Sequence, residues 1–418
     1  MITNNIIFTK YSAWRFNFKK ARDSYIWDDK NKRYIDFTSG WNVTNLGWNR
    51  DEVITAGVKK LKQNSYSPMW ALDESQEQYA KELTTALGHG LTVVARATGG
   101  MEAIEMALKT ARVFTGKKKI VSFLEQFHGS SMNALALSYK PEWISKIADP
   151  RSDIVQLNYP HLYRTKKTEK ELLAELEQDL ETQFKKRDVA ALITEVGIIT
   201  GWGSTYMAPN GFIQLIRKMT KKYGVLLIVD EVGTGFSRIG SLFGIHQFGI
   251  DPDIVVLAKG ISNGSAAMGA MVTTSEIAEA TYAASNLQST FGWNPVACAM
   301  ASKTLALHLE EKTWKQATVK GHYIKETLKK ELKDNTHIGD VRGMGLEIGL
   351  DLVTDKETDK PNTDLLMRVM EKTFSRGLHL VCDLTSNIQL MPPLTISKNN
   401  LERGMDILVS AIQEESKK

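Results

Sequence analysis

Two polar side chains stand where apolar runs of the chain end, and their types could do chemistry together. Asp230 follows the apolar run 225–229, and Lys259 comes soon after the apolar run 254–257. Short runs rich in Val, Ile and Leu predict buried strands of a parallel sheet. Because ligands sit at the carboxyl ends of such strands, the carboxylate and the amine would face one crevice. Each also has a plain structural explanation, as a turn-capping aspartate or a lysine whose ammonium reaches water.

The residues around the lysine are small. Ala258, Gly260 and most of 262–267 leave room for a flat ligand against the backbone. Burial in such a pocket lowers the pKa of a lysine and favours the free amine, which can form a Schiff base. A buried Asp230 would suit a pyridinium nitrogen, because its negative charge keeps that nitrogen protonated.

A glycine-bearing turn offers a second kind of site. Residues 98–103, which include Gly99 and Gly100, join a predicted strand at 91–95 to a predicted helix at 101–114. Backbone N–H groups at a helix N-terminus bind anions, and the helix dipole adds to the attraction. The turn therefore predicts a phosphate site, although an ordinary strand–helix turn explains the same residues equally well.

The wider pattern indicates the scaffold that positions these groups. Apolar strands alternate with helices, and the strands are expected at 91–95, 119–123, 190–194, 225–229, 254–257 and 268–272. This predicts an α/β fold, in which a large domain has a mostly parallel central sheet flanked by helices. A long helical stretch after Asn294 leads into a smaller α+β domain, and a hairpin at 25–37 is expected to pack with it.

The length of 418 residues exceeds what one ordinary core supports. The family resemblance carried by the motifs given below implies three segments: 1–48 as the N-terminal part of the small domain, 49–298 as the large domain, and 299–418 as the C-terminal part of the small domain.

Composition narrows the function classes. The chain is 42% hydrophobic and 24% charged with a net charge of +5, which predicts a soluble globular protein and does not favour nucleic-acid binding. No apolar run approaches the ~20 residues that span a bilayer, so no membrane association is expected. The two cysteines show no CxxC spacing, and no metal site is predicted. A cytoplasmic location follows as the default expectation.

Several motifs occur in the order found in one family. The most specific stretch is 229–240, followed by 248–254 and 258–260. Further matching stretches are 34–37 with 45–47, 127–129, 290–295 and 342–346. The chain resembles the class III (ω-type) aminotransferases of the fold-type I pyridoxal-phosphate enzymes over nearly its whole length. The resemblance implies pyridoxal 5'-phosphate as cofactor and transfer of an amino group from an amine to a 2-oxo acid or aldehyde.

The resemblance also implies roles for single residues. Lys259 would hold the cofactor as a Schiff base and move the proton, and Asp230 would pair with the pyridine nitrogen. Phe127 would stack on one face of the ring, Val232 would pack on the other, and Glu195 matches the family's active-site glutamate.

Two further implied roles concern the phosphate. The backbone N–H groups of Gly100 and Met101 would receive it. Thr290 would reach the phosphate of the neighbouring subunit's cofactor, which implies a homodimer with shared sites, alone or within a tetramer. His128 is expected to be structural, because the lysine supplies the general base.

The sequence departs from the family pattern at several of these positions. Gly99 and Met101 stand where Ser and Thr are common, Phe127 replaces the more usual Tyr, Gly233 sits where some members carry Gln against the ring hydroxyl, and Val196 follows Glu195 in place of Pro.

One departure bears on the substrate. Many members that act on α-amino acids carry an arginine just before the Pro-Pro pair, where its planar fork grips the α-carboxylate. Here the matching position is Gln389, and a second family arginine location matches Cys382. We therefore expect an ω-amine or an amine without an α-carboxylate as donor, unless an arginine such as Arg15 reaches the site. Three tryptophans that could line the substrate pocket, or equally pack in the core, are Trp41, Trp70 and Trp202.

Two other functions stay open on the sequence. A pyridoxal-phosphate-dependent aminomutase would keep both Asp230 and Lys259, and a non-catalytic cofactor-binding protein would usually carry an added DNA-binding segment. Bleaching of a yellow protein by an amine donor separates a catalyst from a binder. Product analysis with and without an acceptor separates an aminotransferase from a mutase.

Overall fold

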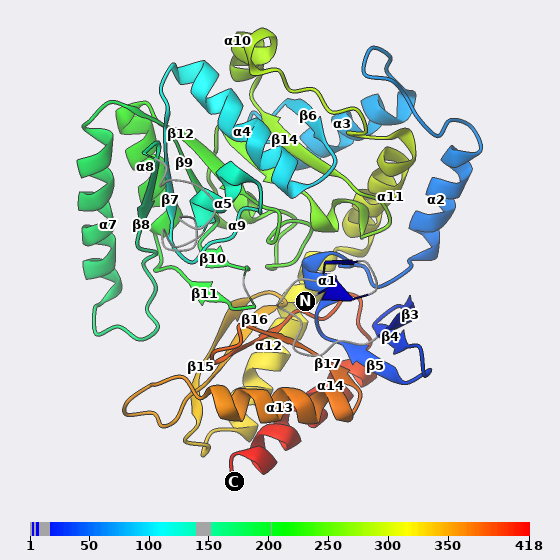
Figure 1. The fold of residues 1–418 in the computed structure, drawn as a ribbon, viewed down its shortest axis with the longest axis vertical. Helices are drawn as coiled ribbons and strands as arrows, with labels where there is room; N and C mark the ends of the chain where they lie inside the picture. The colour runs from blue at the N-terminus through cyan, green and yellow to red at the C-terminus, as the bar shows by residue number, and fades with distance from the viewer. Residues whose placement is uncertain (1, 4–5, 8–16, 139–151, 202) are drawn as a thin grey trace.

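A computed structural model describes residues 2–3, 6–7, 17–138, 152–201 and 203–418. Its centre is a seven-stranded sheet with the order β6-β14-β13-β12-β9-β7-β8 (Figure 1). The strands are β6 Val93–Ala97, β7 Lys119–Phe123, β8 Ile154–Leu157, β9 Val189–Glu195, β12 Leu226–Asp230, β13 Ile254–Leu257 and β14 Gly269–Thr273. Strands β13, β12, β9, β7 and β8 run parallel, while β14 is antiparallel to β13 and to β6. The predicted mostly parallel α/β sheet is confirmed.

Helices cover both faces of this sheet. They are α2 Asp51–Leu61, α3 Glu74–Leu87, α4 Gly100–Thr115, α5 Met132–Ser138, α7 Glu169–Phe184, α8 Phe212–Tyr223, α9 Gly244–Phe248, α10 Ser275–Ser285 and α11 Pro295–Glu311. The expected helix at 101–114 matches α4 to within one residue at each end. The first strand lies two residues further along than expected, because the extended segment begins at Val93.

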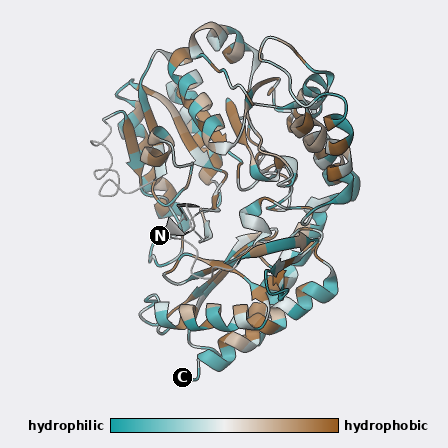
Figure 2. Ribbon diagram, turned by 45° about the vertical axis from the view of Figure 1, so that its right-hand side comes forward, coloured by the Kyte–Doolittle hydropathy of each residue, from teal (hydrophilic) through white to brown (hydrophobic). Residues whose placement is uncertain are grey.

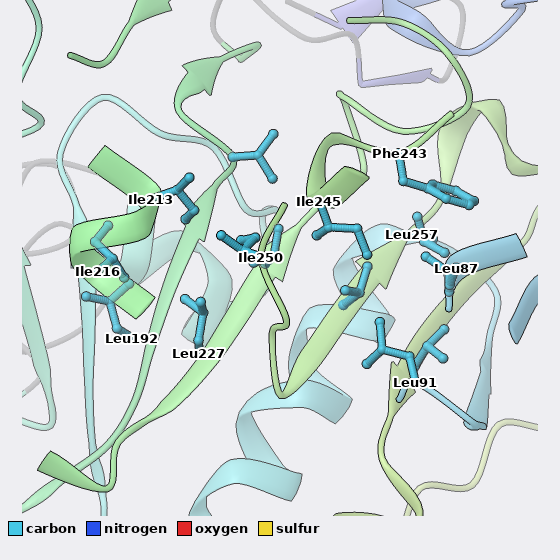
Figure 3. Close-up of a cluster of buried hydrophobic side chains, with 14 of the residues drawn as sticks. Leu87, Leu91, Leu192, Ile213, Ile216, Leu227, Phe243, Ile245, Ile250 and Leu257 are labelled. Carbon is cyan, nitrogen blue, oxygen red and sulfur yellow. The ribbon is translucent and has the colours of Figure 1, made fainter. Parts of the chain in front are cut away.

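Strand β12 shows why the chain forms a sheet buried on both sides. All five of its residues are buried, and neighbouring side chains point to opposite faces. Leu227 and Val229 belong to one apolar cluster, whereas Leu226 and Ile228 belong to another. Figure 3 shows part of the first cluster, where Leu192 and Leu227 of the sheet lie near Ile213 and Ile216 of α8. Figure 2 shows the same arrangement at low magnification, with hydrophobic strands inside and hydrophilic helix faces outside.

A smaller α+β unit lies below the large sheet in Figure 1. One of its sheets has the order β15-β16-β19-β18, formed by Ile338–Met344, Glu347–Leu352, Asn387–Leu390 and Val381–Cys382. Its helices are α12 Thr313–Glu331, α13 Thr363–Ser375 and α14 Lys398–Glu415. The predicted smaller α+β unit is confirmed.

The N-terminal hairpin joins this unit through a second sheet with the order β17-β5-β4-β3. Its strands are β3 Phe18–Arg22, β4 Tyr25–Asp28, β5 Arg33–Asp36 and β17 Leu378–His379. Because β17 pairs in parallel with β5, residues from the two ends of the chain lie side by side. The expected boundary at residue 298 falls inside α11. The division of the chain at 48 and 298 stays a prediction.

The short elements complete the fold. They are β1 Ile2–Thr3, β2 Ile6–Ile7, α1 Ser39–Asn42, β10 Ile198–Ile199, β11 Tyr206–Met207 and the 3-10 helix η1 Lys259–Ser262. Within the described ranges, no helix has both the length and the apolar character to cross a bilayer.

Candidate active site

A cavity of about 500 Å³ opens at the carboxyl ends of the central strands. It lies where β9, β12 and β13 end, and the N-terminus of α4 forms part of its wall. Seven of the residues predicted from the sequence line it: Gly100, Met101, Phe127, Glu195, Asp230, Val232 and Lys259. Residues spread over 160 positions of sequence are therefore brought to one crevice, as expected at the carboxyl ends of parallel strands.

Lys259 begins η1 with a positive φ of 48° and sends a mostly buried side chain into the cavity. Burial lowers the pKa of its amine, while the nearby carboxyls of Glu195 and Asp230 act in the opposite direction. Burial is the larger effect, so the free amine is favoured relative to a lysine in water. This is the form that can attack a carbonyl carbon.

Asp230 is held by two groups at the end of β12. His128 Nδ1 lies 2.7 Å from Asp230 Oδ2, and the Val232 N–H donates to Asp230 Oδ1 over 2.9 Å. These contacts fix the carboxylate, and the histidine has the positioning role expected of it. The other ring nitrogen, His128 Nε2, is buried without a hydrogen-bond partner among the described residues.

The turn before α4 packs so closely against Val232 that a glycine is favoured at position 100. A Cβ at Gly100 would lie 3.1 Å from a methyl group of Val232, tighter than most real contacts. Helix α4 starts here, so its first N–H groups have no partner within the helix and face the cavity wall. Glu102 accepts hydrogen bonds from the N–H and the hydroxyl of Thr98, which fixes the turn just before the helix.

Glu195 ends β9 as a buried carboxyl beside the cavity. Burial and the neighbouring charge of Asp230 raise its pKa to about 8, against the opposing effect of hydrogen bonds from Thr200. Thr200 donates to Glu195 Oε2 from its hydroxyl over 2.7 Å and from its N–H over 3.0 Å. Glu195 Oε1 has no partner in the described part of the chain.

The other five predicted site residues are Trp41, Thr290, Trp70, Trp202 and Gln389, and among the described ones Trp41, Thr290, Trp70 and Gln389 do not line this cavity. Trp41 lies partly buried in α1, and Thr290 is exposed between α10 and α11. Trp70 is 86% exposed and borders a separate hollow together with Arg96 and Leu287. Trp202 lies outside the described residues, and so does Arg15. The expectation that Trp70 lines the crevice of its own chain is therefore not met.

Gln389 is the fifth, and it is fully buried in β19. Its amide N–H₂ donates to the carbonyl oxygen of Thr200 over 3.0 Å and to the carboxyl of Glu347. The side chain thus contacts protein groups behind the cavity wall. The amino-acid sequence does not predict these contacts of Gln389, because they form only when β19 packs against the segment after β10.

Two residues of the site were missed from the sequence. Thr200 lines the cavity and contacts Glu195, and a Cβ at Gly233 would lie 2.0 Å from its hydroxyl. Glu347 is a fully buried carboxyl whose charge reaches Lys259. A Thr in a loop and a Glu at the start of a strand are too common to single out by type or spacing.

The site fits pyridoxal 5'-phosphate by its own features. The cavity contains the mostly buried amine of Lys259 and the buried carboxylate of Asp230, which His128 contacts. Its wall includes the N-terminus of α4, where Gly100 allows close packing. Flat apolar contact surfaces come from Phe127 and Val232. Across the described ranges, no three metal-ligating side chains come together.

This fold and this site define a pyridoxal-phosphate-dependent enzyme of fold type I, with a lysine at the end of a central strand. A family model described as aminotransferase class-III matches residues 8–412. The chain therefore belongs to the class III aminotransferases, and its cofactor is pyridoxal phosphate.

Individual relatives agree over nearly the full length. The chain is 31% identical to the 5-aminovalerate aminotransferase DavT of Pseudomonas aeruginosa, covering 95% of this chain and 93% of that one. Its fold is similar to an (S)-enantioselective omega-transaminase from Thermomicrobium roseum, with a TM-score of 0.90, 30% identity and coverage of 96% and 93%. It is also similar to the taurine:2-oxoglutarate aminotransferase from Bifidobacterium kashiwanohense, solved with PLP and glutamate, with a TM-score of 0.92, 25% identity and coverage of 99% and 96%. The protein is thus an enzyme that transfers amino groups from amines to oxo acids.

Proposed function

We propose that this aminotransferase takes an ω-amine, or an amine without an α-carboxylate, as its donor. The observation that carries the proposal is Gln389, a neutral and fully buried amide where carboxylate-binding members have arginine. In the described part of the chain, no arginine lines the cavity. A donor carboxylate would therefore find no guanidinium to pair with.

The charges around the cavity point the same way. The carboxyls of Glu195, Asp230 and Glu347 all act on the Lys259 amine. Once Lys259 is engaged with the cofactor, the nearby ionisable groups are mainly acidic. Burial raises the pKa of Glu195 and of Glu347, and neither carboxyl supplies a cation that would pair with a donor carboxylate.

The proposed roles of the residues follow from their positions. Lys259 binds the cofactor and moves a proton at the reacting carbon, since its Nζ is the amine in the cavity. Asp230, aimed by His128, pairs with the ring nitrogen, and Phe127 and Val232 hold the ring between them. When bound, pyridoxal phosphate withdraws electrons from the bond that is broken.

The named substrates of two relatives support the donor class. By their names, DavT acts on 5-aminovalerate and the Bifidobacterium enzyme acts on taurine. In both compounds the reacting amine stands on a carbon without a carboxylate. Neither name fixes the donor of this chain.

Matched donors test the proposal. 1,5-Diaminopentane and lysine differ only by the α-carboxylate, and so do 1-aminobutane and norvaline. We expect the carboxylate-free member of each pair to have the higher kcat/KM, by about tenfold or more, because a charge-assisted contact of ~1.5–3 kcal/mol is missing for the acid. A clear preference of the wild-type enzyme for the two α-amino acids would refute the proposal.

We also propose a homodimer in which Thr290 serves the partner's cofactor. Thr290 and the neighbouring Phe291 are exposed in the single chain, and Phe291 is 66% exposed. Trp70 and Tyr66 add further exposed aromatic surface, and the rings of Tyr66 and Phe291 lie 6.0 Å apart. An apolar surface of this kind is typical of a protein interface. A cytoplasmic location remains a prediction.

A further inference from the structure

The segment from Thr200 to Thr205, between β10 and β11, joins the cavity to the small unit. Its first residue contacts Glu195 at the cavity, and its last residue contacts the sheet of β15, β16, β19 and β18. We name the described part of this segment, Thr200, Gly201 and 203–205, the bridging loop.

The bridging loop packs closely against β18 of the small unit and against Phe127 at the cavity. A Cβ at Gly203, where φ is +78°, would lie 2.3 Å from the carbonyl oxygen of Cys382 in β18. A Cβ at Gly201 would lie 2.5 Å from the Cβ of Phe127. Real Cβ atoms do not approach so closely, so glycine is needed at both places.

Polar contacts from the small unit hold both ends of the loop. Gln389 donates to the carbonyl oxygen of Thr200 over 3.0 Å. Glu347 Oε1 accepts from the Thr205 hydroxyl over 3.0 Å and from the Gln389 amide. Arg342 of β15 donates to the carbonyl oxygen of Thr205.

Glu347 is the common partner in this set. It is fully buried at the start of β16, and its other oxygen accepts from the Asn42 amide over 2.7 Å. A buried carboxyl is costly unless its oxygens are satisfied, and here each oxygen has a donor. Removing the carboxyl would leave the hydroxyl of Thr205 and the amide of Gln389 without this acceptor.

We infer that Glu347 and Gln389 are positioning residues, which fix the bridging loop so that Thr200 holds Glu195 in place at the cavity. The chain of contacts runs from Glu347 to Gln389, then to the Thr200 carbonyl, and from the Thr200 hydroxyl and N–H to Glu195. The inference rests on the proposed active site only in taking this cavity as the place of reaction. It assigns Gln389 a part in shaping the site rather than direct contact with substrate.

Two substitutions at one position separate hydrogen bonding from charge. Glu347→Leu removes every contact. Glu347→Gln keeps one acceptor oxygen for Thr205 and Gln389, and Asn42 can turn its amide to accept from the new N–H₂, because Asn42 Oδ1 has no partner among the described residues. Thr373→Val is the control, since Thr373 is equally buried in the small unit but donates within α13 to Met370.

The first measurement is hydrogen–deuterium exchange of the cofactor-loaded protein, read in peptides that cover 198–207. We expect Glu347→Leu to speed exchange there by about tenfold or more, because local opening loses several hydrogen bonds. Glu347→Gln and Thr373→Val should leave exchange near the wild-type rate. This readout does not depend on which amine is the donor, so its failure is distinguishable from failure of the proposed function.

The second measurement is the pH dependence of the bound cofactor's absorption. Thr200 lowers the pKa of Glu195 through two hydrogen bonds, whereas Asp230 raises it and Lys259 lowers it. The phenol of Tyr159 also interacts with this carboxyl. If Glu347→Leu frees Thr200, Glu195 keeps its proton to higher pH and places less negative charge beside the Lys259 nitrogen. The midpoint of the absorption titration should therefore move to lower pH, with kcat lowered about 10- to 100-fold. Glu347→Gln should restore kcat and the part of the midpoint shift that comes from Thr200.

Unchanged exchange and an unchanged midpoint in a folded Glu347→Leu protein would overturn the inference. So would a Glu347→Gln variant as impaired as Glu347→Leu, because that result would assign the effect to charge. If Glu347→Leu fails to fold, Gln389→Met is measured in its place, with loss of the Thr200 contact as the expected cause of faster exchange.

Discussion

At the residue scale, the site is built around an amine whose protonation is controlled by its surroundings. Lys259 begins η1 with a left-handed backbone, φ 48°, which directs its side chain from the strand end into the cavity. A non-glycine residue in this region carries strain, and such strain is found where geometry matters for function. Asp230 stands at the end of the neighbouring strand, and His128 holds it from behind.

Replacing Lys259 with Ala tests the assignment of the amine. We expect a folded protein that still binds the cofactor noncovalently, with turnover lowered by more than about 10³-fold, because both the covalent link and the proton carrier are lost. Steady-state kinetics and cofactor absorption measure these effects. Lys118→Ala, at an exposed lysine of the same domain, is the control. Near-normal turnover of the Lys259 variant would show that another group does the chemistry.

Replacing Asp230 with Asn tests the charge at the ring nitrogen. The amide keeps the size of the side chain but lacks the negative charge, so the ring nitrogen should lose its proton. We expect kcat to fall by more than about 10²-fold while the fold is retained. Unchanged kinetics at full cofactor occupancy would contradict the role.

At the element scale, the ends of β9 and β12 determine which charged side chains lie together in the cavity. Strands β9 and β12 pair in parallel, with Asp230 opposite Glu195, so two carboxyls end side by side. Both are buried, and the charge of Asp230 raises the pKa of Glu195. The bridging loop after β10 offsets part of this cost by donating to Glu195 from Thr200.

Glu195→Gln should change how stability depends on pH. Burial and then Asp230 raise the pKa of Glu195 from 4.5 to about 8 in the folded chain. Below pH 4.5 the group is protonated in both states and has no effect. Between 4.5 and 8 the unfolded state releases the proton first, so the wild-type protein loses stability as pH rises, and the loss is complete above about 8.

Urea unfolding of the cofactor-free proteins at pH 5 and pH 8 measures this effect. The free energy of unfolding of the Gln variant, relative to wild type, should rise by a few kcal/mol, at about 1.4 kcal/mol for each unit of pKa shift. Because Lys259 and Glu195 act on each other, the difference reports the net effect of the Glu195 carboxyl together with its action on Lys259. A constant difference across this range would show that the carboxyl ionises normally.

At the scale of the whole molecule, one arginine ties the parts together. Arg238, which follows β12, is fully buried and donates to the carbonyl oxygens of Leu346 and Pro392 and to the side chain of Asn45. These partners come from the small unit and from the N-terminal segment. Burial lowers the pKa of Arg238 to about 10, which leaves it charged at neutral pH.

Trp70→Glu tests the assembly that the exposed aromatic surface suggests. If Trp70 and Phe291 lie in a dimer interface, a buried negative charge there should disfavour association. We expect the variant to shift toward monomer at micromolar concentration in light scattering, with activity falling in parallel. Lys118→Ala again serves as the exposed control. A wild-type protein that is monomeric and fully active would rule out sharing of Thr290 between subunits.

The sequence by itself determined the sheet and the main chemistry, because these depend on local pattern. Alternating apolar runs were enough to predict the parallel strands, and Asp230 and Lys259 stood out because strand ends meet at one edge of such a sheet. The cofactor, the class and the roles of Phe127, Val232 and Glu195 were available only through resemblance.

Only the tertiary structure decided how the wall of the cavity is made. Gln389 was expected to meet the substrate, yet it binds Thr200 and Glu347 behind the wall. Trp70 was expected either to line the pocket or to pack in the core, and it is exposed in the single chain. These contacts join segments up to about two hundred positions apart, and no periodicity or spacing along a chain encodes which distant side chains meet. They follow from the docking of the small unit on the large sheet, where packing and buried hydrogen bonds select the partners.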